Sequence, residues 1–148
     1  MKTEHALSLV EIRALLNRLA VAGDRGRVEE VADCYVATGI LITPQWTAEG
    51  RAAIVERLGE TRNVAGTAVG RMRHHLTTSD IVLSGSDNAD IRSYFQVWTD
   101  QGYDHSGLYI DRAVVNSMNR WLLTRRDVRV EHRSKKSFLP ADVVAERC

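Results

Sequence analysis

The chain has 148 residues, of which 44% are hydrophobic and 26% are charged, and its formal net charge is +1. This length suits a single domain with a core of useful size. The small net charge gives no overall positive electrostatic potential that would attract nucleic acid or acidic lipid. Cys34 and Cys148 form neither a disulfide framework nor a metal-ligand pattern, which fits a reducing cytoplasm. The sequence has no signal-peptide pattern and no apolar run near the ~20 residues of a membrane helix. We therefore expect one cytoplasmic domain.

The first predicted element is a helix over residues 8–22, because apolar residues recur there at helical spacing. Ser8, with Glu11 three residues later, fits a capping box. The run Gly23-Asp24-Arg25-Gly26 stops the helix. Its apolar stripe is Leu9, Ile12, Leu15, Leu16 and Leu19.

Shorter elements are predicted between this helix and the middle of the chain. We expect further helices over residues 27–35 and 51–59. A short strand over residues 39–43 ends at Pro44, and residues 45–48 are its candidate hairpin partner. Residues 60–70, which are rich in Gly, Ala and Thr, predict a loop.

The second half of the chain changes to the alternating pattern of strands. Short gaps between consecutive strands indicate hairpins and an antiparallel meander. Helices followed by long strands predict an α+β fold, in which three N-terminal helices pack on a curved antiparallel or mixed sheet and enclose a pocket. We expect this domain over residues 1–133 and a tail or lid over residues 134–148. The four predicted strands are 72–83, 89–99, 106–115 and 121–132.

A pair of adjacent histidines lies near the start of the strand predicted over residues 72–83. Because strand side chains alternate, Met72, His74, Leu76 and Thr78 share one face, whereas His75 lies on the face that carries arginines. An apolar face disfavours the charged form of histidine and makes His74 a better neutral base. The alternative is a buried histidine whose ring nitrogens are satisfied by neighbours. No histidine and carboxylate set has metal-ligand spacing, so we expect no metal site.

Two acidic residues each have a simpler interpretation. Asp24, in Gly23-Asp24-Arg25-Gly26, fits ordinary turn chemistry at the end of a helix. Asp111, followed by Arg112, predicts an ion pair or a solvated strand face. These interpretations need no function.

Six short segments occur in order between about residues 7 and 133, and together they resemble one family. The segments are Glu11-Ile12-Arg13, Gly23-Asp24-Arg25-Gly26, Gly50-Arg51-Ala52-Ala53-Ile54, Arg73-His74-His75-Leu76-Thr77-Thr78, Ser93-Tyr94-Phe95, and Arg120-Trp121-Leu122-Leu123 with Arg126 and Val128. Their types, order and spacing resemble the SnoaL-like branch of the cone-shaped nuclear-transport-factor-2 superfamily. That superfamily includes enzymes and proteins without chemistry of their own, so the fold does not settle the function.

The resemblance implies a catalytic pair. In dehydratase and dehydrochlorinase members, an Asp at the end of the first helix hydrogen-bonds a His on the first long strand, and the matching residues are Asp24 and His74. Arg126 matches an arginine that helps to polarise the leaving group. Leu19 stands where several relatives carry a Tyr or Lys that serves as an acid. A substitute donor could come from Tyr35, Tyr94, Tyr109 or His105.

The implied function is cofactor-free proton abstraction from a hydrophobic small molecule, followed by a dehydratase-type (lyase) elimination. A polyketide cyclase, a ketosteroid-type isomerase, a non-catalytic binding protein and the small subunit of an oxygenase are the alternatives. An apolar outer sheet face predicts a homodimer or homotrimer; it carries Leu108, Ile110, Val114, Leu122 and Val130. The expected pocket residues are Leu19, Tyr35, Trp46, Met72, Leu76, Phe95 and Tyr109.

Overall fold

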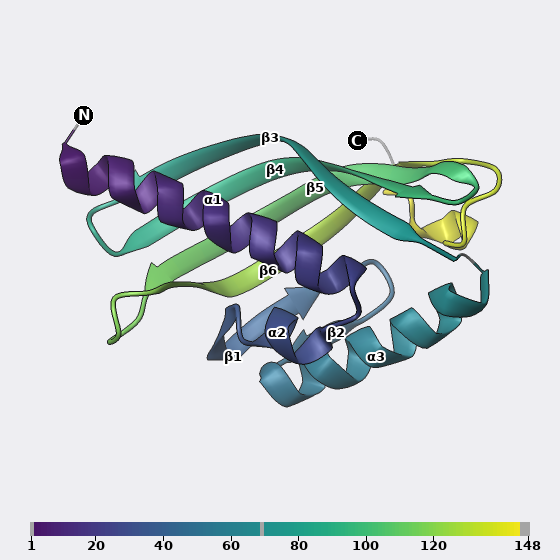
Figure 1. Ribbon diagram of the computed structural model, residues 1–148, viewed down its shortest axis with the longest axis horizontal. Coiled ribbons are helices and arrows are strands. Elements are labelled where there is room, and N and C mark those ends of the chain that lie inside the picture. Colours follow the sequence, from purple (N-terminus) through teal and green to yellow (C-terminus); the bar gives the residue numbers. More distant parts are fainter. Residues whose placement is uncertain (1, 69, 146–148) are drawn as a thin grey trace.

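Six strands form a single curved sheet with helices on its concave side (Figure 1). The computed structural model describes residues 2–68 and 70–145, with residues 64–68 described as backbone only, so Cys148 lies outside the described residues. The strands are β1 (Tyr35–Ile42), β2 (Thr47–Glu49), β3 (Met72–Ser84), β4 (Asn88–Thr99), β5 (Gly102–Val115) and β6 (Trp121–Arg133). Their order is β2-β1-β6-β5-β4-β3. Strands β3 to β6 form an antiparallel meander, whereas β1 runs parallel to β6.

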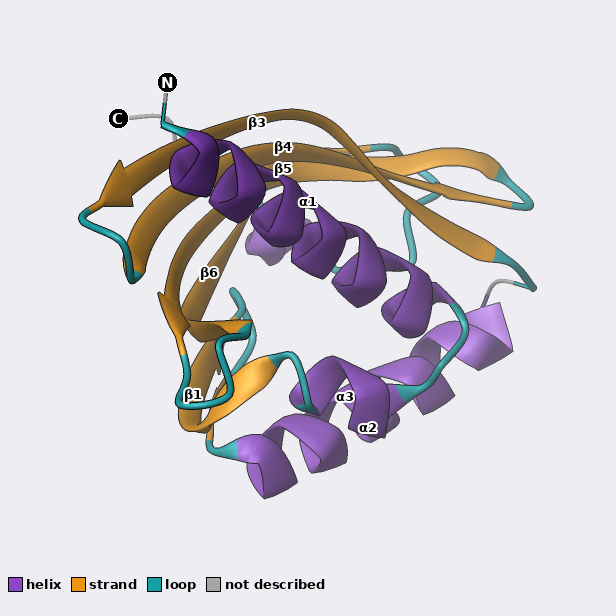
Figure 2. Ribbon diagram, turned by 60° about the vertical axis from the view of Figure 1, so that its left-hand side comes forward, coloured by secondary structure: helices purple, strands orange, loops and turns teal. Residues whose placement is uncertain are grey.

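The helices are α1 (Thr3–Asp24), α2 (Val28–Ala32) and α3 (Arg51–Ala68). Figure 2 shows α1 along the concave side of the sheet, with α2 and α3 beyond it near β1. The buried stripe of α1 packs into the main core, and removing it from water contributes about 25 cal/mol per Å² of apolar area. The predicted α+β architecture, with three helices on a curved mixed sheet, is confirmed. The buried stripe is Ile12, Leu15, Leu16, Leu19 and Ala22.

The start of the first helix differs from the prediction. Helix α1 begins at Thr3, its N-cap residue is Lys2, and no side chain caps it. Ser8 and Glu11 therefore lie inside the helix, and the predicted capping box is wrong. Good helix formers before Ser8 allow the helix to extend to the N-terminal side.

Two predicted boundaries in the middle of the chain are also wrong. The predicted helix over residues 27–35 ends early, because Tyr35 starts β1 and pairs with Leu123 of β6. The predicted loop over residues 60–70 is helical as far as residue 68. A glycine such as Gly59 costs a helix interior about 1 kcal/mol, but α3 packs against α2 and β1. Tertiary contact therefore outweighs the local preference.

Strand β3 contains a bulge that changes which side chains face inward. Met72, His74 and Leu76 are partly buried, as the alternation predicts. The register with β4 shifts between Leu76 and Thr78, so Thr78 is exposed, contrary to the prediction. Ser79 takes the inner position instead. A bulge inserts one extra residue and reverses the faces beyond it.

The outer sheet face is less open to a partner than expected. Leu108, Leu122 and Val130 are already buried within one chain, so they are not a free docking patch. Tyr94 and Trp98 are the aromatic residues exposed on this face, at 53% and 44%. The predicted homodimer or homotrimer stays a prediction, with a different candidate contact.

Residues 134–145, here called the C-terminal strap, fold back on the sheet. The strap contains a short 3-10 helix (Ala141–Val143), and Val144 pairs with Val130 of β6. Val143 is buried. In the part of the chain that the structure describes, no helix is both long and apolar enough to cross a membrane.

Candidate functional site

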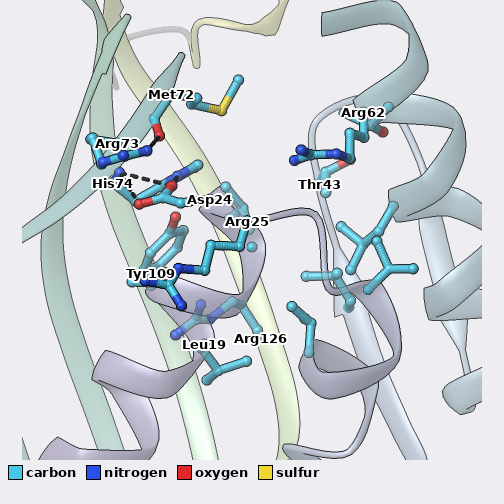
Figure 3. Close-up of a pocket in the computed structure, with 18 of the residues that line it drawn as sticks. Leu19, Asp24, Arg25, Thr43, Arg62, Met72, Arg73, His74, Tyr109 and Arg126 are labelled. Atoms are coloured by element: carbon cyan, nitrogen blue, oxygen red, sulfur yellow. Dashed lines mark hydrogen bonds and ion pairs between the residues drawn. The ribbon is translucent and has the colours of Figure 1, made fainter. Parts of the chain in front are cut away.

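A cavity of about 750 Å³ lies between the concave face of the sheet and the helices (Figure 3). Phe95 does not line it, contrary to the prediction; this residue is buried behind Tyr109, and their rings stack with centroids 4.2 Å apart. Tyr94, a candidate donor, is exposed on the opposite face of the sheet and cannot serve the cavity. The other predicted pocket residues do line it: Leu19, Tyr35, Trp46, Met72, Leu76 and Tyr109.

Asp24 and His74 meet at the wall of this cavity. The Nδ1 atom of His74 lies 2.6 Å from Oδ1 of Asp24. The backbone N–H of His74 also donates to both carboxylate oxygens, each at 3.1 Å. Asp24 is the last residue of α1, where the helix dipole disfavours a negative charge. Its position is therefore explained by the histidine that it holds rather than by helix stability.

The contacts of Asp24 select one form of the His74 ring. An ionised carboxylate only accepts hydrogen bonds, so Nδ1 of His74 donates to Asp24, and in the neutral ring Nε2 is then the nitrogen with the lone pair. The side chain of His74 is 24% exposed and lines the cavity. His75 is exposed on the other face of β3, as predicted. The structure thus presents one imidazole, oriented by a carboxylate, to the cavity.

A second imidazole and carboxylate pair lies at the same cavity. Nδ1 of His105 is 2.7 Å from Oδ2 of Asp104, and both residues are buried. Neighbours in a strand normally face opposite sides, but the register between β4 and β5 shifts at Asp104. Burial lowers the pKa of His105, while Asp104 acts in the opposite direction. His105 lines the cavity and is neutral near pH 7.

Asp104 also holds the C-terminal strap. Its carboxylate accepts hydrogen bonds from the hydroxyl of Ser137 at 2.6 Å and from the backbone N–H of Phe138 at 3.1 Å. The ring of Phe138 meets His105 edge-on, with centroids 5.7 Å apart. Phe138 and Leu139 line the cavity. The strap is therefore a wall of the cavity rather than a loose tail.

The charge partners of Asp111 and Arg126 differ from the prediction. Asp111 is 1% exposed and accepts two hydrogen bonds, each 2.8 Å long, from Nε and Nη2 of Arg126. Arg112 lies on the outer face and pairs with Asp90 at 3.3 Å. The expected pairing of Asp111 with Arg112 is wrong, since adjacent strand residues face opposite sides.

Arg126 does line the cavity, as predicted. Its Cζ atom lies 4.0 Å above the centre of the Tyr109 ring. Burial acts to lower the pKa of Arg126, but Asp111 raises it by more, so the guanidinium stays charged. Asp111 takes two of the N–H groups of Arg126, and the guanidinium also packs on the ring of Tyr109.

Two tyrosine hydroxyls of the cavity remain protonated. Burial raises the pKa of Tyr35, and it raises the pKa of Tyr109 to about 12. Figure 3 shows the hydroxyl of Tyr109 directed towards Asp24 and His74. These hydroxyls are therefore donors rather than anions. Among the residues that the structure describes, no three His, Cys, Asp or Glu side chains are grouped as metal ligands.

A family model described as the SnoaL-like domain matches residues 4–127 of the sequence. The chain belongs to the SnoaL-like family. The match covers α1 and most of the sheet, so it contains both Asp24 and His74. Among curated proteins, no match to the sequence was found.

Solved structures show the same architecture as this SnoaL-like protein. A proposed scytalone dehydratase from Novosphingobium aromaticivorans has a TM-score of 0.83 and 20% identity, over 100% of this chain and 99% of that chain. A protein from Catenulispora acidiphila has a TM-score of 0.75 and 28% identity, over 85% of this chain and 93% of that chain. A structure from the same organism in complex with S-DNPA has a TM-score of 0.74 and 28% identity, over 84% of this chain and 94% of that chain. An NTF2-like protein with a cystatin-like fold from Novosphingobium aromaticivorans has a TM-score of 0.75 and 24% identity, covering 90% of each chain.

Sequence reasoning missed several residues at the cavity of this SnoaL-like domain. Nothing in the sequence indicated a role for Asp104, because a bulge cannot be located from periodicity. The sequence indicated a role for the strap residue Phe138 only weakly, since the segment 134–148 was expected to be a tail or a lid. Arg25 and Arg62 also line the cavity. Neither was expected there, because Arg25 fitted a turn and Arg62 fell in the predicted loop.

Proposed function

We propose that this protein is a cofactor-free enzyme that removes a proton from a carbon beside a carbonyl group of a largely apolar small molecule, and then eliminates water. The observation that carries the proposal is the His74–Asp24 pair at the wall of the cavity, with Nδ1 2.6 Å from the carboxylate. A cavity of about 750 Å³ fits a substrate of a few fused rings.

The proposed reaction uses His74 as the base. Its Nε2 takes the C–H proton, and Asp24 stabilises the imidazolium that forms. The electron pair moves into the carbonyl group, whose oxygen accepts a hydrogen bond from the protonated hydroxyl of Tyr109 or Tyr35. A hydroxyl on the next carbon then leaves, takes the proton from the imidazolium and departs as water. The histidine ends the cycle neutral, and a C=C bond replaces the C–H and C–O bonds.

Leu19 by itself favours the non-catalytic alternative, and with it an elimination would require one histidine to do both proton transfers. The side chain of Leu19 can neither donate nor accept a proton. His105 is buried with a lowered pKa, so it adds a second acceptor rather than an acid. A base that returns its own proton to the leaving hydroxyl needs no separate acid. Cyclase and isomerase reactions begin with the same abstraction and differ in the fate of the resulting enolate.

Deuterium exchange tests the abstraction step without knowledge of the substrate. The probe is 2-tetralone, an apolar bicyclic ketone whose C1 protons exchange in D₂O in a reaction that can be followed by NMR. We expect the protein to accelerate this exchange, and His74→Gln to lose at least about 100-fold of the acceleration. His75→Gln is the matched control, because His75 is the exposed neighbour on the opposite face.

The outcomes separate the candidate functions. Exchange by His74→Gln at the rate of the unmodified protein would remove His74 as the base. Binding of the ketone without any acceleration would instead favour a small-molecule-binding protein. Because Asp24 also holds the backbone of His74, Asp24→Asn is interpreted only after circular dichroism shows that the variant is folded.

A further inference from the structure

One part of the cavity wall is strongly cationic. The described residues that line the cavity include five arginines but only one carboxylate, that of Asp24. Asp24 is paired with His74, and Arg126 is paired with Asp111. The whole chain has a net charge of only +1, so this excess is local to the cavity. The remaining arginines of the wall are Arg25, Arg62, Arg71 and Arg73.

Arg25 and Arg62 approach the cavity from two different helices. In Figure 3 the side chain of Arg25 runs from the end of α1 towards Tyr109, and that of Arg62 enters from α3 on the opposite side. A Cβ atom at Gly26 would collide with Cζ of Arg62, so this guanidinium lies against the residue next to Arg25. Gly26 has a φ of 68°, where other residues are strained. The bare backbone at residue 26 thus leaves room for the guanidinium of Arg62.

Among the residues that the structure describes, no carboxylate forms an ion pair with either of these two guanidinium groups. The ion pairs in the described part of the chain include neither Arg25 nor Arg62. A hollow lined by one sign of charge concentrates ions of the other sign. Guanidinium forks match the two oxygens of a carboxylate, and such charge-assisted pairs are among the stronger hydrogen bonds. The wall is therefore complementary to an organic anion.

We infer that the cavity takes an organic acid, with an apolar ring body and a carboxylate attracted by the cationic wall to which Arg25 and Arg62 contribute. Asp24 precedes Arg25 directly, so the carboxylate would bind at the end of the cavity where His74 acts on the ring body. Apolar side chains such as Leu19, Leu41 and Val128 line the rest of the wall. This inference rests on the proposed function in one respect, because it takes the cavity as the substrate site.

Calorimetric titration with 2-naphthoate and with methyl 2-naphthoate tests the inference. The two probes share the ring system and differ in charge. We expect the acid to bind more tightly than the ester, and Arg25→Gln or Arg62→Gln to weaken the acid about tenfold each, with no change for the ester. Arg27→Gln and Arg57→Gln are matched controls, since these exposed arginines pair with Glu30 and Glu60 and do not line the cavity.

Three results would overturn the inference. They are equal binding of the acid and the ester, unchanged binding of the acid to the variant that lacks both Arg25 and Arg62, and no binding of the acid to the unmodified protein at millimolar concentration. The exchange assay with His74→Gln is independent of these titrations. If binding of the acid depends on the arginines but exchange is unchanged in His74→Gln, the anion site is retained and the proposed chemistry is rejected. If exchange depends on His74 but binding of the acid does not depend on the arginines, only the anion site is rejected.

Discussion

Replacing Asp111 by Asn should destabilise the protein strongly, because this carboxylate is the counterion of a buried guanidinium. Asp111 is 1% exposed and Arg126 is 8% exposed, and two hydrogen bonds of 2.8 Å join them. Two charge-assisted hydrogen bonds, at about 1.5–3 kcal/mol each, set an upper bound of about 6 kcal/mol. Asn keeps one acceptor oxygen, so we expect a loss of about 3 kcal/mol, at the lower end for breaking a buried pair.

Urea denaturation followed by tryptophan fluorescence measures this loss. Asp90→Asn is the control, because Asp90 makes the same type of pair with Arg112 on the exposed face, at 3.3 Å. The control should lose no more than about 1 kcal/mol. If Asp111→Asn were as stable as Asp90→Asn, the buried guanidinium of Arg126 would not depend on Asp111 for its stability, and the reasoning would be wrong.

Two further predictions concern pH and assembly. Burial lowers the pKa of His105 below its ordinary 6.5, so the unfolded chain binds more protons below that pH, and acidification through this window should reduce stability. The urea midpoint of the unmodified protein should fall between pH 7.5 and pH 5.5, and we expect that of His105→Asn to fall by less. An equal fall in both proteins would argue against the lowered pKa of His105. Tyr94 and Trp98 are exposed on the outer sheet face, so we expect a homodimer or homotrimer in sedimentation velocity and a monomer for Tyr94→Lys, and sedimentation of the unmodified protein as a monomer would contradict this.

Hydrophobic periodicity predicted most of the fold. The four long strands were placed within a few residues, because alternation is a local property of each strand. The same alternation put His74 on the inner face of β3. It failed beyond Leu76, where a bulge reverses the pattern. The predicted loop over residues 60–70 failed because the contact of α3 with α2 and β1 is not visible in local sequence.

It was harder to predict which distant residues pair with each other than to predict which face of a strand a residue occupies. Asp24 and His74 are 50 residues apart, and only the family resemblance brought them together. Asp111 and its sequence neighbour Arg112 were expected to form an ion pair or a solvated strand face, although alternation places the two on opposite faces. Its true partner, Arg126, lies opposite it on β6. Asp104 reaches His105 only through a bulge, so its role required the three-dimensional structure.

The most direct measurement is the NMR detection of the His74 ring nitrogens and their attached protons in ¹⁵N-labelled protein. If Asp24 and His74 act as one proton-handling pair, His74 will be the tautomer with its proton on Nδ1, and this signal will be lost in a folded Asp24→Asn variant but kept in His75→Gln. A His74 ring with its proton on Nε2, unchanged by Asp24→Asn, would contradict the pair and leave the cavity without its proposed base.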